Sequence, residues 1–349
     1  MDANTQPQTL LEAMRYFSDP DVCLDFVALL RWPNGVACPT CGSVDVRFLA
    51  TRRVWECKSK HPRKQFSVKV GTIFEDSPIG LDKWLAAIWM IANDKNGISS
   101  YEIARGIGVT QKSAWFMLHR IRLAMQTGTF QKLSGDVEVD ETFLGGKARN
   151  MHKDVRERKI HGRGPSGKII VMGILERHGR ARLAVVPNRD TTTLQAKVRE
   201  HVAPGATVYT DELASYAGLD VDYLHEVINH AESYARGVVH TNGMENFWSL
   251  LGRTVDGTYV SVEPFHLTRY LDEQAYRFDH RKENDGERFV GTFEGTVGRR
   301  LTYDKLTGNV ESSDVLVTER QGRGKRKPKE QRDDRRQDAN TGANAIWAV

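Results

Sequence analysis

The sequence lacks any apolar stretch that approaches the roughly 20 residues a membrane-spanning helix needs, so we expect no transmembrane segment. The first 20 residues also lack the basic-then-apolar order of a secretion signal. Cysteine is scarce, with four in 349 residues, and there is no internal repeat. These absences predict a cytoplasmic protein whose cysteines are metal ligands or buried thiols rather than disulfides.

A large excess of charge of one sign is also lacking, because the net charge is only +5. The placement of the charge is nevertheless uneven. Residues 147–182 hold eleven Lys or Arg against three acids, and residues 319–336 hold nine against four. Basic stretches at defined places predict contact with a polyanion. A solvated loop or tail is the alternative for each stretch.

The chain is long enough, at 349 residues, for two or three domains that each have a core. It is 40% hydrophobic and 27% charged, as ordinary soluble proteins are. The residue pattern changes four times along the chain. We predict a helical segment at 1–30, a region of cysteines and β-formers at 31–78, helices at 79–128, alternating strands and helices at 133–285, and an extension at 286–349 with a basic, flexible tail.

The cysteine spacing predicts a structural zinc site. Cys38 and Cys41 form a CxxC knuckle, and Cys57 and His61 follow about 15 residues later, across a predicted hairpin. Four such donors complete a tetrahedral site for one Zn²⁺. The alternative is a lone CxxC with His61 on the surface. Cys23 stands in an apolar helical setting, and we expect it in the core.

Residues 81–125 carry a helix-turn-helix pattern. Ser99 or Ser100 is the expected cap of a first helix, a short turn follows at 106–109, and Thr110 caps a second helix at 111–122. In a DNA-binding module the second helix enters the major groove. The residues then available to bases and phosphates are Gln111, Lys112, Ser113, His119, Arg120 and Arg122. A three-helix packing module without DNA contact is the alternative.

Three acidic residues suggest one catalytic site. Asp140 and Asp211 each end an alternating run that predicts a strand, and Glu245 lies near the start of a helical run. Two strand-end aspartates and a helix-borne glutamate can converge on two divalent ions, as in sites that cut and join phosphodiesters. Carboxylates are the hard ligands that Mg²⁺ prefers. A single acid of this kind is usually a solvated surface group, so the combination carries the prediction.

The predicted order from residue 136 onward is strand, basic loop, strand, strand, helix, strand, helix. This order matches the outline of the ribonuclease H-like fold, in which acids on the first and fourth strands are adjacent. We therefore predict a multi-domain α+β protein. A zinc ribbon and a helix-turn-helix come first, followed by an α/β ribonuclease H-like catalytic domain with a mixed sheet.

Several motifs together resemble a known family. Residues 137–147 (VEVDETFLGGK), 209–212 (YTDE) and 240–253 (HTNGMENFWSLLGR) are similar to the DDE transposases of bacterial insertion sequences, specifically the ISXO-type group. Residues 66–74 (FSVKVGTIF) and 269–281 (RYLDEQAYRFDHR) are similar too. The resemblance covers about residues 35 to 281, and the joint occurrence of these motifs in order is highly specific.

The resemblance implies a DNA transposase that binds the ends of an insertion sequence, cleaves to free 3′-hydroxyls and joins them to target DNA. It implies two Mg²⁺ (or Mn²⁺) ions held by Asp140, Asp211 and Glu245, with double-stranded DNA as partner. Joining two ends implies a homo-oligomer, at least a dimer on DNA. We also expect Lys147 and Arg149 of the basic loop to contact DNA.

The third catalytic position stays open between Glu245 and two nearby amides, Asn242 and Asn246. The family pattern places a basic residue seven positions beyond the third catalytic residue. From Glu245 that position is Gly252, whereas Arg253 lies seven beyond Asn246. An amide is a weaker Mg²⁺ ligand than a carboxylate, which favours Glu245. We expect Arg253 to contact phosphate, with a surface ion pair as the alternative.

The neighbouring acids Glu138, Glu141 and Glu212 are expected to support the site rather than bind metal, since strand alternation points Glu141 away from Asp140. Two other functions remain possible at this point. One is a nuclease of the same fold that cuts without joining. The other is a zinc-ribbon DNA-binding regulator whose catalytic domain is inactive.

Overall fold

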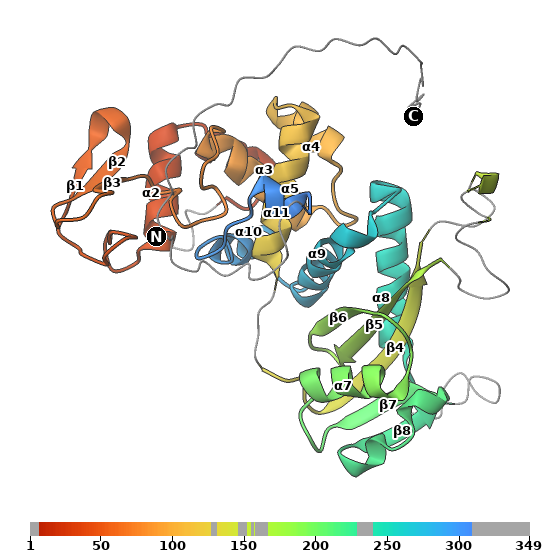
Figure 1. The fold of residues 1–349 in the computed structure, drawn as a ribbon. Helices are drawn as coiled ribbons and strands as arrows, with labels where there is room; N and C mark the ends of the chain where they lie inside the picture. Colours follow the sequence, from red (N-terminus) through yellow and green to blue (C-terminus); the bar gives the residue numbers. More distant parts are fainter. Residues whose placement is uncertain are drawn as a thin grey trace, which may run out of the picture. The chain divides into compact units, whose positions relative to one another are not determined.

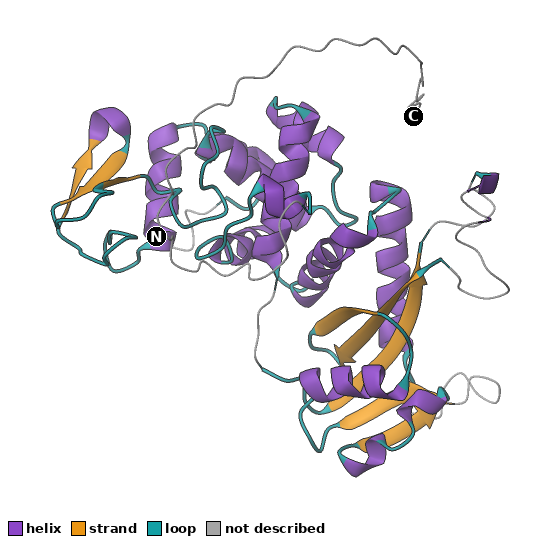
Figure 2. Cartoon of the chain, in the orientation of Figure 1, coloured by secondary structure: helices purple, strands orange, loops and turns teal. Residues whose placement is uncertain are grey.

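The structure is a computed structural model, which describes residues 7–126, 131–145, 152–154, 157, 167–228 and 240–308. All of these belong to the first of two compact units, Met1–Val317. Figures 1 and 2 show their helices and strands. The basic tail, Lys147 and Arg149 lie outside the described residues. No helix in the described part of the chain is both long enough and apolar enough to cross a membrane.

The predicted N-terminal helical segment is two helices, α1 (Leu10–Tyr16) and α2 (Pro20–Arg31). Thr9 and Glu12 form a capping box at the start of α1. Asp19 caps α2, and Pro20 occupies its first turn. Proline has no N–H to donate and is therefore favoured at that position, which makes it a natural start for a second helix.

A three-stranded antiparallel sheet follows, with strands β1 (Val46–Leu49), β2 (Val54–Cys57) and β3 (Gln65–Phe66). β1 and β2 are the hairpin that the sequence predicts between the two halves of the cysteine motif, and a short 3₁₀ turn, Ala50–Arg52, joins them. The hairpin brings Cys57, at the end of β2, back toward the CxxC knuckle.

Three helices then follow, α3 (Leu81–Asn93), α4 (Ser100–Ile107) and α5 (Gln111–Met125). Ser99 is the cap of α4, in a capping box with Glu102, and Thr110 caps α5. α4 ends at Gly108, whose φ of 63° is the left-handed conformation that glycine adopts without strain. The second predicted helix therefore begins as expected and extends three residues beyond its predicted end.

The second half of the described chain contains a five-stranded mixed sheet. Its strands are β4 (Asp136–Leu144), β5 (Ile169–Glu176), β6 (Ala181–Val186), β7 (Thr207–Asp211) and β8 (Leu224–Ile228). Their order across the sheet is β6-β5-β4-β7-β8. β5 is antiparallel to β4 and β6, whereas β7 is parallel to β4 and β8. The mixed sheet is confirmed, and β8 is a strand that the sequence analysis missed.

Each face of this sheet is covered by helices (Figure 2). Helix α7 (Thr191–His201) packs Leu194 and Val198 against one face. Helices α8 (Asn242–Arg253) and α9 (Leu267–Asp279) cover the other face. Because side chains alternate along a strand, β4 turns Val137 and Val139 to the α7 side, which leaves the residues between them for the α8 side.

The remaining described elements complete these layers. Helix α10 (Asp285–Glu294) inserts Phe289 and Phe293 into the core formed by α1–α5, although we predicted residues 286–349 as an extension. Short helical segments fill the connections: Ala214–Tyr216, Leu219–Val221, the π-helix Thr254–Tyr259, Pro264–His266 and α11 (Tyr303–Leu306).

Candidate active site and metal centre

Asp140 and Asp211 stand at matching positions on neighbouring parallel strands. The pairing of β4 with β7 runs through Glu138, opposite Tyr209. Two residues further along each strand come Asp140 and Asp211. Asp211 ends β7 as expected, whereas Asp140 lies in the middle of β4, which continues to Leu144. Since parallel strands advance together, the register brings both aspartates to the same level of the sheet.

The Asp140 carboxylate is held at both oxygens. Trp248 on α8 donates its indole N–H to Oδ2 at 2.9 Å, and the backbone N–H of Glu141 donates to Oδ1 at 2.8 Å. Burial raises the pKa of Asp140, the two hydrogen bonds lower it, and the charges of Asp211 and Glu245 raise it again. The net shift is upward. The charges of Asp211 and Glu245 therefore both reach the Asp140 carboxylate.

Glu245 is presented by the first turn of α8. The helix buries Met244, Phe247 and Leu251 against the sheet and α9, and Glu245 itself is exposed. Helix α8 approaches the sheet closely at Gly173 of β5. A Cβ added to this glycine would lie 2.6 Å from the Trp248 ring. Of the two aromatic residues beside Glu245, Phe247 lies in the core, and Trp248 is partly buried with its N–H directed at Asp140.

Glu138 fastens the start of α8 to β4. Its side chain is almost completely buried and accepts a hydrogen bond of 2.9 Å from the backbone N–H of Met244. Arg177 pairs with it at 3.0 Å and also donates to the His240 carbonyl at 2.6 Å. His240 lies 3.4 Å from the same carboxylate through Nδ1. Glu138 is therefore engaged in holding the helix that carries Glu245.

The two other neighbouring acids differ from Glu138. Glu141 accepts a hydrogen bond from the hydroxyl of Tyr216, which belongs to the core on the α7 side of the sheet. Burial, followed by the charges of Asp211 and Asp140, raises the pKa of Glu141 to about 8. Glu212 is exposed.

The two amide alternatives for the third position, Asn242 and Asn246, lie on the same helix as Glu245 and are exposed, as it is. Asn246 lines a cavity of about 550 Å³ together with Glu138, Arg177 and Arg281. Neither Asp140 nor Glu245 lines that cavity. Asn242 is exposed at the first position of α8.

The structure corrects three of the predicted DNA contacts, because the side chains of His119, Arg120 and Arg122 are all buried. Arg122 is buried and pairs at 2.6 Å with Glu273, which is also buried. Arg120 is buried and donates to the backbone carbonyls of Ile73, Glu75 and Leu301. A guanidinium enclosed by protein cannot reach a phosphate, so the prediction of DNA contact was wrong for both arginines.

The other predicted contacts on α5 lie in its first turn. Lys112 is exposed, with its ammonium group 5.0 Å from the ring centre of Tyr303. Gln111 donates to the Ser100 hydroxyl at 2.8 Å, and Ser113 accepts from Thr110 at 2.9 Å.

On α8, Arg253 is exposed and bonds only to its own helix among the interactions seen in the described residues, through the carbonyl and hydroxyl of Ser249.

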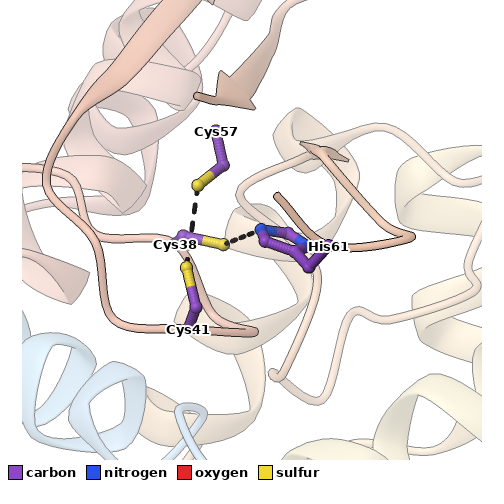
Figure 3. A group of neighbouring side chains, drawn as sticks. All are labelled: Cys38, Cys41, Cys57 and His61. Carbon is purple, nitrogen blue, oxygen red and sulfur yellow. Dashed lines mark hydrogen bonds between the residues drawn. The ribbon is translucent and has the colours of Figure 1, made fainter. Parts of the chain in front are cut away.

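A separate cluster gathers the predicted zinc donors (Figure 3). The donor atoms of Cys38, Cys41, Cys57 and His61 all lie within 4.8 Å of one another. Burial raises the pKa of the Cys57 thiol, but hydrogen bonds from His61 and from groups of Ser59 and Cys41 bring it down to about 6. Cys23 is buried in the α-helical core and donates to the Phe17 carbonyl, as expected of a structural thiol.

Comparisons with known proteins match two stretches of the chain. Residues 132–279 match the model of the ISXO2-like transposase domain, and residues 18–61 match the model of the transposase zinc-ribbon domain. The chain belongs to the ISXO2-like transposase family. The transposase-domain match contains Asp140, Asp211 and Glu245, and the zinc-ribbon match contains all four clustered donors.

Relatives of this transposase-family chain carry similar names. It is 29% identical over 261 residues to a Halobacterium salinarum protein named "Uncharacterized protein in transposable element ISH50", covering 71% of this chain and 86% of that protein. It is 37% identical over 97 residues to an "Uncharacterized transposase-like protein" of Haemophilus influenzae, covering 28% of this chain and 78% of the relative.

Proposed function

We propose that this chain is a DNA transposase that binds the ends of an insertion sequence, cleaves them to free 3′-hydroxyls and joins these to target DNA. One observation carries the proposal. Asp140 and Asp211 stand at the same level of adjacent parallel strands, and the helix bearing Glu245 is hydrogen-bonded to Asp140 through Trp248. The family assignment supports a transposase, and this arrangement supports catalysis at these three acids.

The donor set fits two divalent cations of the Mg²⁺ or Mn²⁺ type. All three groups are carboxylates, which such ions prefer. Sites that cut and join phosphodiesters commonly hold two such ions. When bound, the two ions activate a water or a 3′-hydroxyl and stabilise the leaving oxygen. Asp140, whose pKa is raised by the charges of both other acids, would hold metal together with Asp211 and Glu245.

We further propose that the sheet is a ribonuclease H-like catalytic core. Its order, β6-β5-β4-β7-β8, has the first strand in the middle and the fourth strand beside it in parallel. That order supports the expected pairing of acids on the first and fourth strands.

Helices α4 and α5 are the proposed helix-turn-helix. The left-handed Gly108 and the Thr110 cap make the short turn that this motif needs. Lys112, Gln111 and Ser113 at the start of α5 remain the proposed DNA contacts of this motif, and Arg253 is a proposed phosphate contact on α8.

The four-donor cluster is the proposed site of one structural Zn²⁺. Three thiols and an imidazole are the donors that zinc binds in tetrahedral structural sites. The cluster joins the CxxC knuckle to the hairpin end, so an ion there would hold the small sheet together. Double-stranded DNA is the proposed partner, and joining two element ends calls for at least two copies of the chain. Because its proposed substrate is the DNA of the element, we propose that the protein acts in the cytoplasm, at the nucleoid.

A strand-transfer assay on the element's ends, with and without Mg²⁺, tests the proposal. We expect Mg²⁺-dependent joined products that disappear in Asp140→Asn and Asp211→Asn while binding to the ends is retained. Asp220→Asn, an exposed acid outside the site, serves as the matched control. Cleavage without joined products would indicate a nuclease. DNA binding without any metal-dependent cleavage would indicate an inactive regulator.

A further inference from the structure

We propose that Trp248 is a positioning residue for the metal-binding acids: its indole N–H fixes the orientation of Asp140 and, through α8, the placement of Glu245. This inference rests on the proposed metal-dependent function. The bond in question joins Trp248 Nε1 to Asp140 Oδ2 over 2.9 Å, within the normal range for a hydrogen bond.

The bond leaves Asp140 with one defined orientation. Its other oxygen accepts the backbone N–H of Glu141 at 2.8 Å, so neither oxygen can rotate without losing a partner. A carboxylate has about four acceptor sites. Among the described residues, two of these sites on Asp140 are occupied, which leaves the others for ions. Hydrogen-bonded partners of this kind orient metal-binding side chains, and their loss weakens metal binding.

The sheet is shaped to admit the indole. Gly173 of β5 lies directly opposite Asp140 of β4 in the antiparallel register. A Cβ at Gly173 would lie 2.6 Å from Cη2 and 2.7 Å from Cζ2 of Trp248, and closer still to the Met244 methyl group. Any other residue at this position would therefore have to displace one or both side chains from the strand. Because Gly173 has no side chain, the Trp248 ring can occupy the space beside it and reach Asp140.

The same helix is attached to β4 at a second point. Glu138, two residues before Asp140 on the same face of the strand, accepts from the Met244 N–H at 2.9 Å. Trp248 follows Met244 by one helical turn. Glu245 lies between these two attachments, three positions before Trp248, and helical residues three apart are neighbours. A helix fixed at both points cannot rotate, so the distance between Asp140 and Glu245 is set by these two bonds.

The test uses Trp248→Phe, which removes the N–H donor and retains an aromatic ring. Mn²⁺ is titrated into the zinc-loaded full-length protein without DNA, and free Mn²⁺ is followed by electron paramagnetic resonance. Loss of a partner that orients a metal ligand typically weakens binding by about 10- to 100-fold. We expect the Mn²⁺ half-saturation to rise about tenfold.

Trp84→Phe is the matched control. Trp84 donates its indole N–H to the Ser77 hydroxyl at 3.1 Å, in the core formed by α1–α5. This substitution removes the same kind of bond elsewhere and should leave the half-saturation unchanged. Gly173→Ala is a second variant, which retains both partners and crowds the ring, and it should raise the half-saturation in the same direction.

The indole N–H signals provide a readout that does not depend on metal. The chain has seven tryptophans, and the signal that Trp248→Phe removes should shift in Asp140→Ala, whereas that of Trp84 should not. If the wild-type protein binds no Mn²⁺, the proposed metal function fails and this role with it. If the wild type binds Mn²⁺ and Trp248→Phe binds it equally well, only the positioning role is overturned.

Discussion

Arg122 on α5 and Glu273 on α9 form an ion pair of 2.6 Å in which both side chains are almost fully buried, with 1% and 0% of their surface exposed. Arg277 pairs with the same carboxylate, and the hydroxyl of Tyr259 donates to it. The pair joins a helix of the proposed DNA-reading motif to a helix of the transposase domain. A buried ion pair of this kind ties two elements in one geometry, because separating them would leave unpaired charges away from water.

The first prediction concerns the stability of this junction. Glu273→Gln leaves two arginines around a neutral amide, whereas Arg122→Met leaves Glu273 with Arg277. Breaking a buried pair by removing one partner costs about 3–5 kcal/mol. We therefore expect Glu273→Gln to lower the free energy of unfolding by about that amount, and Arg122→Met to lower it less. Urea unfolding followed by circular dichroism provides the measurement.

An exposed pair is the control for this comparison. Lys197 and Glu200 pair at 2.6 Å on α7, with about a third and a half of their side chains exposed. Surface pairs contribute about 0–1 kcal/mol, so Lys197→Met should change stability little. Equal effects of Lys197→Met and Glu273→Gln would show that the buried pair does not hold the two helices together.

The junction also shows where sequence reasoning stops. The helix caps, the hairpin and the strands carrying Asp140 and Asp211 follow local rules, such as an N-cap hydroxyl or side-chain alternation, and the structure has them. Arg122 was predicted to face DNA because it lies on the second helix of the helix-turn-helix pattern, which enters the major groove in DNA-binding modules. Its partner is 151 residues away in the sequence, and only the fold brings the two together.

Strand β8 and the hydrogen bond from Trp248 to Asp140 also could not be predicted from the sequence, because both depend on the fold. Strand β8 is an edge strand with Leu224 and Val227 exposed, so it lacks the clean alternation that marks a half-buried strand. The bond from Trp248 to Asp140 spans 108 residues. In the sequence, Trp248 appears only as an apolar residue at helical spacing, while the space left by Gly173 depends on the register of two strands.

The second prediction concerns acid sensitivity. His119 is fully buried among Trp115, His266 and Tyr270, and neither ring nitrogen has a hydrogen-bond partner among the described residues. Burial, and then the charges of Arg122, His266 and Arg269, lower its pKa to about 2. The folded protein therefore keeps this imidazole neutral, while the unfolded chain takes up a proton below about pH 6.5.

Only the unfolded chain binds this proton, so His119 lowers the free energy of unfolding as the pH falls. Its full contribution to stability is present above about pH 6.5 and is lost as the pH falls toward the pKa of the folded state. From pH 6.5 to 5.5 the wild type should lose about 1 kcal/mol more than His119→Phe. Urea unfolding at the two pH values measures the difference. His178→Asn, which replaces an exposed histidine, should lose as much as the wild type. Equal losses in His119→Phe and the wild type would contradict the assignment.

The third prediction concerns zinc. The protein should contain one Zn²⁺ per chain, measured by atomic absorption, and Cys41→Ser or Cys57→Ser should lose it. Cys23→Ala is the matched control, because Cys23 is a buried thiol outside the cluster. This substitution should leave the zinc content unchanged. Metal binding at such sites contributes directly to folding. Chelation should therefore expose residues 18–61 to limited proteolysis while the five-stranded sheet stays protected. Full zinc in Cys57→Ser would exclude the proposed ligand set.

The fourth prediction identifies the third acid. Glu245 interacts electrostatically with Asp140, whereas Asn246 lines a cavity that neither of these acids reaches. Replacing a metal-binding carboxylate with an amide removes a charge opposite the ion, and metal-ion stabilisation is worth several kcal/mol. Each 1.36 kcal/mol is about tenfold in rate. We therefore expect Glu245→Gln to slow Mg²⁺-dependent cleavage on the order of 10²-fold or more.

Asn242→Ala and Asn246→Ala are the matched comparisons on the same helix, and both should stay within a few-fold of the wild type. Single-turnover cleavage of end DNA, with DNA affinity measured in parallel, separates a loss of chemistry from a loss of binding. If Asn246→Ala abolished cleavage while Glu245→Gln retained it, the third ligand would be the amide. Arg253, seven positions beyond Asn246, would then occupy the place of the family's basic residue. If Glu245→Gln alone abolishes cleavage, Gly252 occupies that place instead, and the basic residue has moved one position along the helix to Arg253.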